Sequence, residues 1–138
     1  MERTLGIIKP DAFARKLSGD IIKQIEASGL TVCALKMMHL SGRQVEKFYE
    51  VHKARPFYGA LCQYMSSGPV IVMVLSGERA IERWRELMGA TDPGKAAAGT
   101  IRKQFGQDIE KNAVHGSDAP ATAANEIAFF FSEMEIVR

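Results

Sequence analysis

The amino-acid sequence predicts an α+β domain, a ferredoxin-like βαββαβ sandwich in which a four-stranded antiparallel sheet carries helices on one face and an inserted loop. Apolar runs and amphipathic segments follow one another in the order strand, helix, strand, helices, strand, helix, strand, which is the order of the split βαβ arrangement. The sequence lacks the glycine fingerprint of a Rossmann sheet, and its 138 residues suit a single domain over residues 1–138.

The first two strands and the helix between them are indicated by apolar runs and by the residues that end them. The run at 5–8 is apolar and stops at Pro10, since proline has no amide hydrogen to donate. Ser18 opens a helix whose isoleucines share one side, and Gly29 ends it. The β-branched, apolar-rich stretch at 30–40 is the expected second strand.

Two helices are expected before the third strand. Ser41 is the predicted cap of a helix over 44–51, because a serine oxygen can accept a free amide at a helix start. A short amphipathic helix follows at 58–65. The third strand, at 70–75, is apolar on both faces and is therefore expected in the centre of the sheet.

The clearest helix begins at 76–78, because apolar residues recur at helical spacing between 81 and 88. The small and polar residues at 89–99 predict a long loop of the kind that often carries function. A short helical turn is expected at 100–105.

The end of the chain is expected to complete the sheet. Pro120 opens another short helix, and the apolar, aromatic run at 126–131 is read as the last strand.

Composition limits the partners that this chain can have. Lysine and arginine (18) outnumber aspartate and glutamate (16) only slightly, and a net charge of +2 does not favour nucleic acid. The longest apolar run, at 70–75, is far too short to span a bilayer, and the first residues show no signal-peptide pattern. Cys33 and Cys62 have no Cys-x-x-Cys spacing and are expected to be reduced. These features predict a cytoplasmic protein without a membrane partner.

The heptad Asn112–Asp118 is the strongest candidate for chemistry. It places His115 beside Gly116, which lets the chain turn sharply and hold the ring away from the packed interior. A neutral imidazole can act as a base, a metal ligand or a nucleophile. On these residues alone, a solvated histidine in a surface turn explains the pattern equally well.

Several alternatives lack their defining residues. The segment Gly89–Ala96 nearly matches the P-loop motif, but Ala96 stands where the motif needs a Ser or Thr hydroxyl for magnesium. The segment is also expected to follow a helix, whereas a P-loop follows a strand. No residue pair has zinc-ligand spacing. Phosphate binding without a P-loop requires converging cations, for which Lys9, Arg85 and Arg102 are candidates.

Several short motifs stand in order along the chain. The most specific are the histidine heptad and Gly99-Thr100-Ile101-Arg102. The supporting motifs are Lys9-Pro10-Asp11, Tyr49 with His52, Arg55-Pro56-Phe57, Ser67-Gly68-Pro69 and Gly89-Ala90-Thr91-Asp92-Pro93. In order and spacing, and over essentially the whole chain, these motifs resemble those of the nucleoside diphosphate kinase family.

The resemblance implies a reaction. Members of that family move the γ-phosphate of a nucleoside triphosphate, typically ATP, to any nucleoside diphosphate by a ping-pong route with Mg²⁺. By resemblance, His115 is the nucleophile and is phosphorylated on Nδ1, and the family forms homo-oligomers, either tetramers or hexamers in bacteria. No protein ligand for the metal is expected, since the nucleotide phosphates hold it.

The resemblance also assigns roles to the other site residues. Glu126 would orient the imidazole, Ser117 would hold Glu126, and Tyr49 would lie behind the ring. The expected nucleotide contacts are Arg85, Thr91 and Arg102 on the phosphates, Lys9 and Asn112 on the ribose 3′-hydroxyl and the transferring group, and Phe57 opposite Ile109 on the base.

Departures from the family pattern are modest. Asp92, Ala98 and Ala119 stand where many members have asparagine, proline and serine, and Ala98 puts the rigidity of the long loop in doubt. The rival interpretations are a nucleotide-binding regulatory protein that has lost catalysis and a nucleic-acid-binding protein. The intact set of cations, amide, histidine and glutamate argues against the first, and the net charge against the second.

Overall fold

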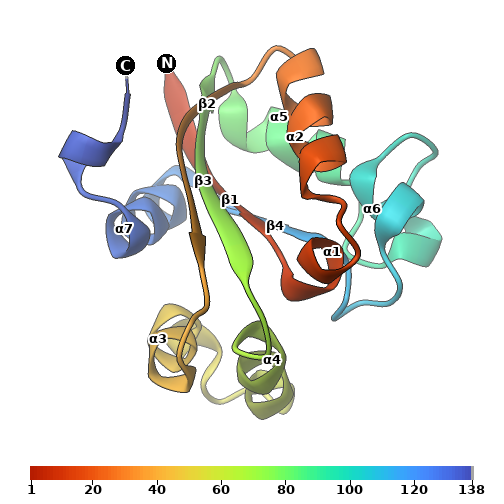
Figure 1. Ribbon diagram of the computed structural model, residues 1–138, viewed down its shortest axis with the longest axis vertical. Coiled ribbons are helices and arrows are strands. Elements are labelled where there is room, and N and C mark those ends of the chain that lie inside the picture. Colours follow the sequence, from red (N-terminus) through yellow and green to blue (C-terminus); the bar gives the residue numbers. More distant parts are fainter. Residues whose placement is uncertain (138) are drawn as a thin grey trace.

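The computed structural model describes residues 1–137 and contains a four-stranded sheet of order β2-β3-β1-β4, in which every neighbouring pair is antiparallel (Figure 1). This is the strand order of the predicted ferredoxin-like fold, which is confirmed. The strands are β1 (Glu2–Ile8), β2 (Thr31–Met38), β3 (Val70–Gly77) and β4 (Val114–Gly116).

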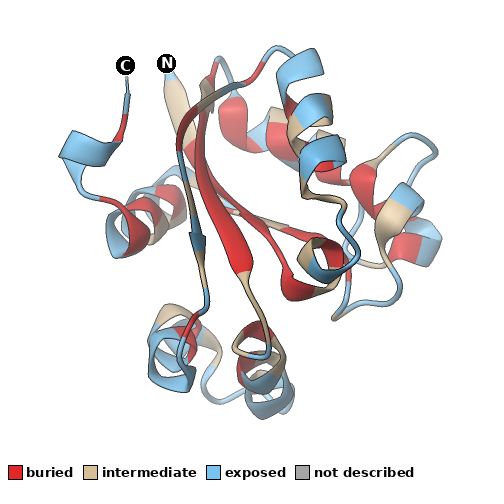
Figure 2. Ribbon diagram, in the orientation of Figure 1, coloured by how far each residue is buried: buried red, intermediate tan, exposed pale blue. Residues whose placement is uncertain are grey.

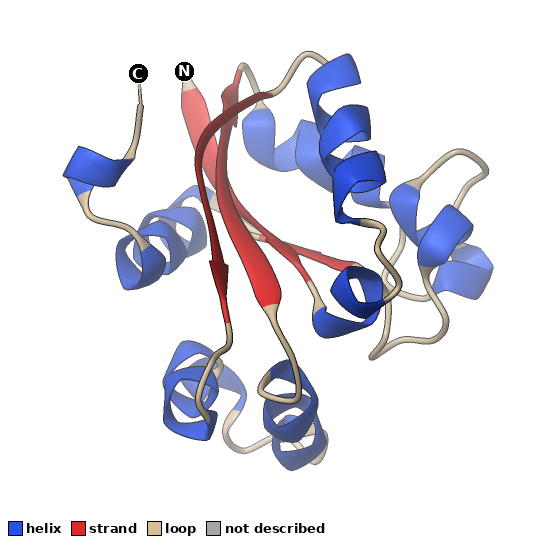
Figure 3. Cartoon of the chain, viewed as in Figure 1, coloured by secondary structure: helices blue, strands red, loops and turns tan. Residues whose placement is uncertain are grey.

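Within residues 1–137, seven α-helices and three short 3₁₀ helices connect and cover the strands (Figure 3). Ser41 is the predicted cap: its Oγ accepts from Gln44 N at 3.1 Å. Pro10, predicted only to end the first strand, is also the first residue of a helix, where its missing amide hydrogen costs nothing. The helices are α1 (Pro10–Ala14), α2 (Ser18–Ala27), α3 (Gly42–Phe48), η1 (Glu50–His52), α4 (Tyr58–Met65), α5 (Ala80–Met88), η2 (Pro93–Lys95), α6 (Ile101–Phe105), α7 (Pro120–Phe130) and η3 (Glu133–Glu135).

Helices cover both faces of the sheet, so the prediction that they lie on one face is wrong. Side chains of a strand alternate between the faces, and thus Leu5 and Ile7 point one way while Ile8 points the other. α3, α4 and α7 pack on the first face, and α2 and α5 pack on the second (Figure 1). Strands β1 and β3 are consequently buried on both sides (Figure 2).

The predicted last strand at 126–131 is also wrong, and this error is the source of the other one. Residues 126–130 form the second half of α7, while the fourth strand is β4, three residues inside the histidine heptad. Ala123, Ile127 and Phe130 are buried at spacings of four and three, which is a helical period. The helix that was taken for a strand therefore covers the face that was expected to be bare.

Close packing against one tryptophan fixes β4 on the sheet. β4 pairs with β1, where His115 lies opposite Ile7. Trp84 of α5 is fully buried beneath Gly6 and Gly116, and its Nε1 donates to the main-chain oxygen of His115 at 3.1 Å. The two glycines leave room for the indole, so α5 and the histidine strand are held together.

The remaining predictions on sulfur and membranes can be compared with the structure. Both Cys33 and Cys62 are free thiols, as predicted. None of the helices within residues 1–137 has the length and apolar character that a membrane crossing requires.

We expect Gly116→Ala to destabilise the fold by about 1–3 kcal/mol, the usual cost of overpacking a filled core. A Cβ atom there would lie 2.6 Å from Met88 Cε and from Trp84 Cδ1. Urea denaturation measures the loss. In the control Gly19→Ala, in α2, nothing lies within 4 Å of the new Cβ, so stability should be unchanged or slightly higher. Equal unfolding free energies for wild type and Gly116→Ala would contradict this packing.

Candidate active site

A cavity of about 1270 Å³ lies beside β4, between α5 with the loop that follows it and the segment that contains the histidine heptad. It brings together most of the predicted site residues, which come from distant parts of the chain. Those on its wall are Lys9, Tyr49, Phe57, Arg85, Thr91, Arg102, Ile109, Asn112 and His115. Of the other two predicted residues, Glu126 contacts the histidine ring and Ser117 donates a hydrogen bond to Glu126.

One edge of the His115 ring is held by a chain of hydrogen bonds that begins in the sheet. Leu5 N donates to Ser117 Oγ at 3.2 Å, and Ser117 Oγ donates to Glu126 Oε1 at 2.8 Å. The same oxygen contacts His115 Nε2 at 3.0 Å. Because a carboxylate can only accept, Nε2 carries the proton of the neutral ring and Nδ1 keeps a lone pair. Among residues 1–137, Nδ1 has no hydrogen-bond partner, and the side chain is 18% exposed.

Two aromatic rings pack edge-on against the imidazole and fix its plane. The Tyr49 and His115 ring centroids lie 6.2 Å apart at an interplanar angle of 87°. Phe48, which the sequence analysis did not single out, lies 5.6 Å from the same ring. Burial, and secondarily the charge of Glu126, raises the pKa of the Tyr49 hydroxyl, so this group stays neutral at the histidine's side.

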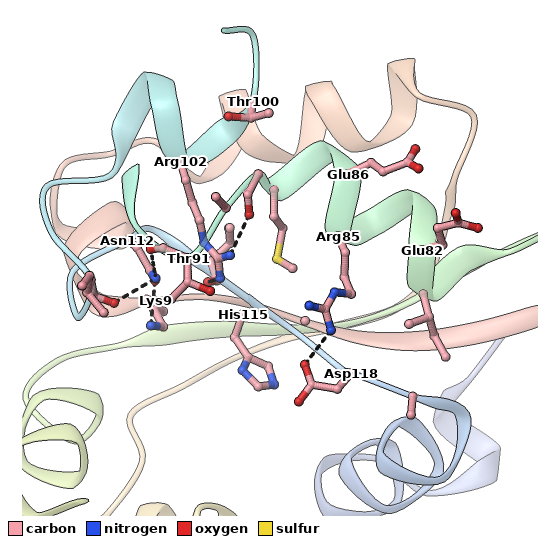
Figure 4. Close-up of a pocket in the computed structure, with 18 of the residues that line it drawn as sticks. Lys9, Glu82, Arg85, Glu86, Thr91, Thr100, Arg102, Asn112, His115 and Asp118 are labelled. Carbon is pink, nitrogen blue, oxygen red and sulfur yellow. Dashed lines mark hydrogen bonds and ion pairs between the residues drawn. The ribbon is translucent and has the colours of Figure 1, made fainter. Parts of the chain in front are cut away.

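Lys9 and Asn112 form a buried pair at the opposite end of the cavity from Asp118 (Figure 4). Lys9 Nζ donates to Asn112 Oδ1 at 2.8 Å and to the main-chain oxygen of Glu110 at 3.2 Å. Burial, followed by the charge of Arg102, lowers the pKa of Lys9 from 10.5 to about 8. Asn112 Nδ2 in turn donates to the Thr91 main-chain oxygen at 3.0 Å, which ties the long loop to this pair.

Arg102 is buried and only partly satisfied. Its Nη1 donates to the Gly89 oxygen at 2.9 Å and its Nη2 to the Val114 oxygen at 2.8 Å. Its Nε is buried without a hydrogen-bond partner in the described part of the chain. Burial and the nearby charge of Arg85 lower the pKa of Arg102 to about 10. Beyond burial, therefore, Arg102 lowers the pKa of Lys9, and Arg85 lowers the pKa of Arg102. A bound anion would relieve this repulsion between neighbouring cations.

Arg85 and Asp118 lie nearer the solvent. Arg85 Nη1 pairs with Asp118 Oδ1 at 2.8 Å, with side chains 51% and 78% exposed (Figure 4). An exposed pair of this kind contributes little to stability, so the guanidinium can exchange the carboxylate for a ligand at small cost. Phe57 and Ile109 are also exposed where they line the cavity, at 47% and 62%.

No built metal site accompanies these cations. Within residues 1–137, no three His, Cys, Asp or Glu side chains gather to hold a metal ion. The arrangement therefore combines a neutral ring nitrogen with three cations, which suits a highly charged anionic ligand.

The sequence matches the family model for nucleoside diphosphate kinase over residues 2–136. The chain belongs to the nucleoside diphosphate kinase family. It is 60% identical over 136 residues to the nucleoside diphosphate kinase of Desulfatibacillum aliphaticivorans, with 99% of each chain covered. It is 56% identical over 137 residues to that of Nitratidesulfovibrio vulgaris, again over 99% of each chain.

Solved structures of the same family superpose closely on this chain. The nucleoside diphosphate kinase of Aquifex aeolicus has a TM-score of 0.96 at 47% identity, with 99% of each chain covered. The halophilic enzyme of Halobacterium salinarum, solved in complex with CDP, has a TM-score of 0.96 at 40% identity over 99% of this chain and 91% of that one.

Family membership confirms the resemblance seen in the sequence and establishes the reaction. Nucleoside diphosphate kinases transfer the terminal phosphoryl group of a nucleoside triphosphate to a nucleoside diphosphate through a phosphohistidine. The chain is thus a phosphotransferase, and kinases that handle nucleotides generally use a divalent metal.

Proposed function

We propose that His115 is the nucleophile of this reaction and that Nδ1 takes the phosphoryl group. The contact that supports this is the one between Nε2 and Glu126, because it leaves Nδ1 unprotonated in a cavity lined by cations. Nδ1 attacks the γ-phosphorus while the bond to the β–γ bridging oxygen breaks, and the diphosphate leaves. A terminal β-phosphate oxygen of the acceptor then attacks the same phosphorus, and the P–N bond breaks.

We propose that Arg85, Thr91 and Arg102 bind the phosphates of either nucleotide. Arg102 supports this best, since its buried Nε–H has no hydrogen-bond acceptor within residues 1–137 and its pKa is lowered by burial and by Arg85. Phosphoryl transfer depends mainly on positioning and on neutralising charge, which such donors supply. Lys9 and Asn112 would hold the ribose 3′-hydroxyl and the transferring group.

The divalent ion is proposed to be Mg²⁺ and to enter with the nucleotide. The residues present fit this role, because the cavity is lined by cations that can bind the phosphates carrying the ion. Within the described residues, no cluster of His, Cys, Asp or Glu could hold the ion by itself. Bound Mg²⁺ would neutralise phosphate charge.

Phe57 and Ile109, exposed on the cavity wall, would sandwich the base, and stacking on a ring face tolerates every base.

Residues 1–138 are proposed to act as one nucleoside diphosphate kinase domain in the cytoplasm and to assemble as a homo-tetramer or homo-hexamer. A bare sheet face does not provide the interface, since α7 covers the face that was expected to carry no helices. Support comes instead from β2, an edge strand that exposes Leu35 and Met37. Sedimentation velocity at micromolar concentration separates these assemblies from a monomer. A monomer under these conditions would refute the proposal.

Incubation with ATP and no acceptor should add the mass of one phosphoryl group to the intact chain, and a nucleoside diphosphate should remove it. The adduct should be labile in acid and stable in alkali, as phosphohistidine is. His115→Ala should abolish it. His39→Ala is the control, because His39 lies outside the cavity and bonds the Ser66 oxygen. An adduct that persists in His115→Ala would reject the assignment.

Binding of ADP should take up protons near pH 8. The pKa of Lys9 is about 8 in the free protein, and bound phosphates should raise it, so about half a proton per site is taken up at that pH. For the same reason the affinity for ADP should fall as the pH rises above 8, where Lys9 is neutral. Calorimetry in buffers of different ionisation enthalpy counts the protons. Lys9→Met should bind more weakly and without this uptake; equal uptake in both proteins would overturn the role of Lys9.

A further inference from the structure

Ala113, two residues before His115, has a backbone conformation that an alanine seldom adopts. Its φ is +75°, and Val114 N donates to the Asn112 oxygen at 2.9 Å across it. A hydrogen bond between residues i and i+2 with positive φ in the centre is a γ-turn of the rare, strained kind. Strain of this size persists only where the surroundings impose it.

Asp11 supplies one of two contacts that impose this turn. Ala113 N donates to Asp11 Oδ2 at 3.1 Å, and the Ala113 oxygen accepts from Lys9 N at 2.9 Å. Both peptide groups of the strained residue are therefore held from the start of α1. Ala113 is fully buried, so water cannot replace either contact.

The Asp11 carboxylate is itself held from a third element. Tyr64 of α4 donates its hydroxyl hydrogen to Asp11 Oδ1 and accepts from Asp11 N at 2.9 Å. With one carboxylate oxygen on Tyr64 and the other on Ala113, the carboxylate has one orientation. Asp11 and Tyr64 do not line the cavity. Their contacts reach the site only through the turn.

We propose that Asp11, held by Tyr64, is a positioning residue that keeps the turn at Ala113 closed and so sets Asn112 and Lys9 against His115. The proposal rests on the role of His115 proposed above. Asn112 is the first residue of the turn and bonds Lys9, while His115 follows the turn on β4. Opening the turn would rotate these groups relative to each other, and a misplacement of about 1 Å at reacting groups can cost up to about 10²-fold in rate.

The test is a set of variants in single-turnover phosphorylation by saturating ATP. Asp11→Ala should slow the transfer by about tenfold or more. Ala113→Gly in the Asp11→Ala protein should restore most of the loss, because glycine adopts positive φ without strain and no longer needs the clamp. Tyr64→Phe should slow the transfer less, and should be rescued by the same change. Asp20→Ala, an exposed aspartate of α2 that bonds Gln24, should leave the rate unchanged.

The outcomes separate this proposal from the one that it rests on. If wild-type protein is not phosphorylated on His115, the proposed nucleophile fails. If it is, and Asp11→Ala or Tyr64→Phe reacts at the wild-type rate, the positioning role fails alone. A purely stabilising Asp11 would give a loss that glycine at 113 does not rescue, and that result would also overturn the proposal. Tyr64→Phe carries the test if Asp11→Ala does not fold.

Discussion

The contact between His115 Nε2 and Glu126 Oε1, 3.0 Å long, is the constraint on which the rest of the structure depends. It selects the tautomer and leaves the lone pair on Nδ1, which is the attacking nitrogen in the proposed mechanism. Ser117 carries this constraint back to Leu5 in the central strand β1, so the ring is oriented by the sheet and not by a loose turn. Trp84 holds the main chain of the same residue from the other face. The histidine lies on the wall of the cavity, yet the residues that hold it are anchored in the buried core.

Around that ring the fold gathers three cations, Lys9, Arg85 and Arg102, on the wall of one cavity. Burial lowers the pKa values of Lys9 and Arg102, and the charge of Arg102 adds to the effect on Lys9 while that of Arg85 adds to the effect on Arg102. Arg85 itself pairs with the exposed carboxylate of Asp118. This arrangement costs stability in the free protein and favours a ligand that brings several negative charges. In the proposed mechanism that ligand is a nucleotide with its phosphates, and catalysis is chiefly the placement of charge before the substrate arrives.

Most of the residues that line the candidate site could be named from the sequence because they stand in short, spaced motifs, whereas parts of the fold could not be predicted. The run at 126–131 has the apolar, aromatic composition of a strand. The helix is recognised from the burial of Ala123, Ile127 and Phe130, which are spaced at a helical period. The true strand β4 is three residues long, too short for periodicity to reveal. Phe48, which packs on the ring of His115, and Trp84, which bonds its main-chain oxygen, were missed because these contacts join distant parts of the chain. No local pattern records such a contact.

The position of the phosphoryl group on the ring tests the central claim most directly. Nuclear magnetic resonance of the phosphorylated protein, labelled with ¹⁵N in histidine, distinguishes a phosphoryl group on Nδ1 from one on Nε2. Because Glu126 holds Nε2, the account predicts that the group is bonded to Nδ1 of His115. A phosphoryl group on Nε2 would show that the contact with Glu126 does not direct the chemistry, and would contradict the account.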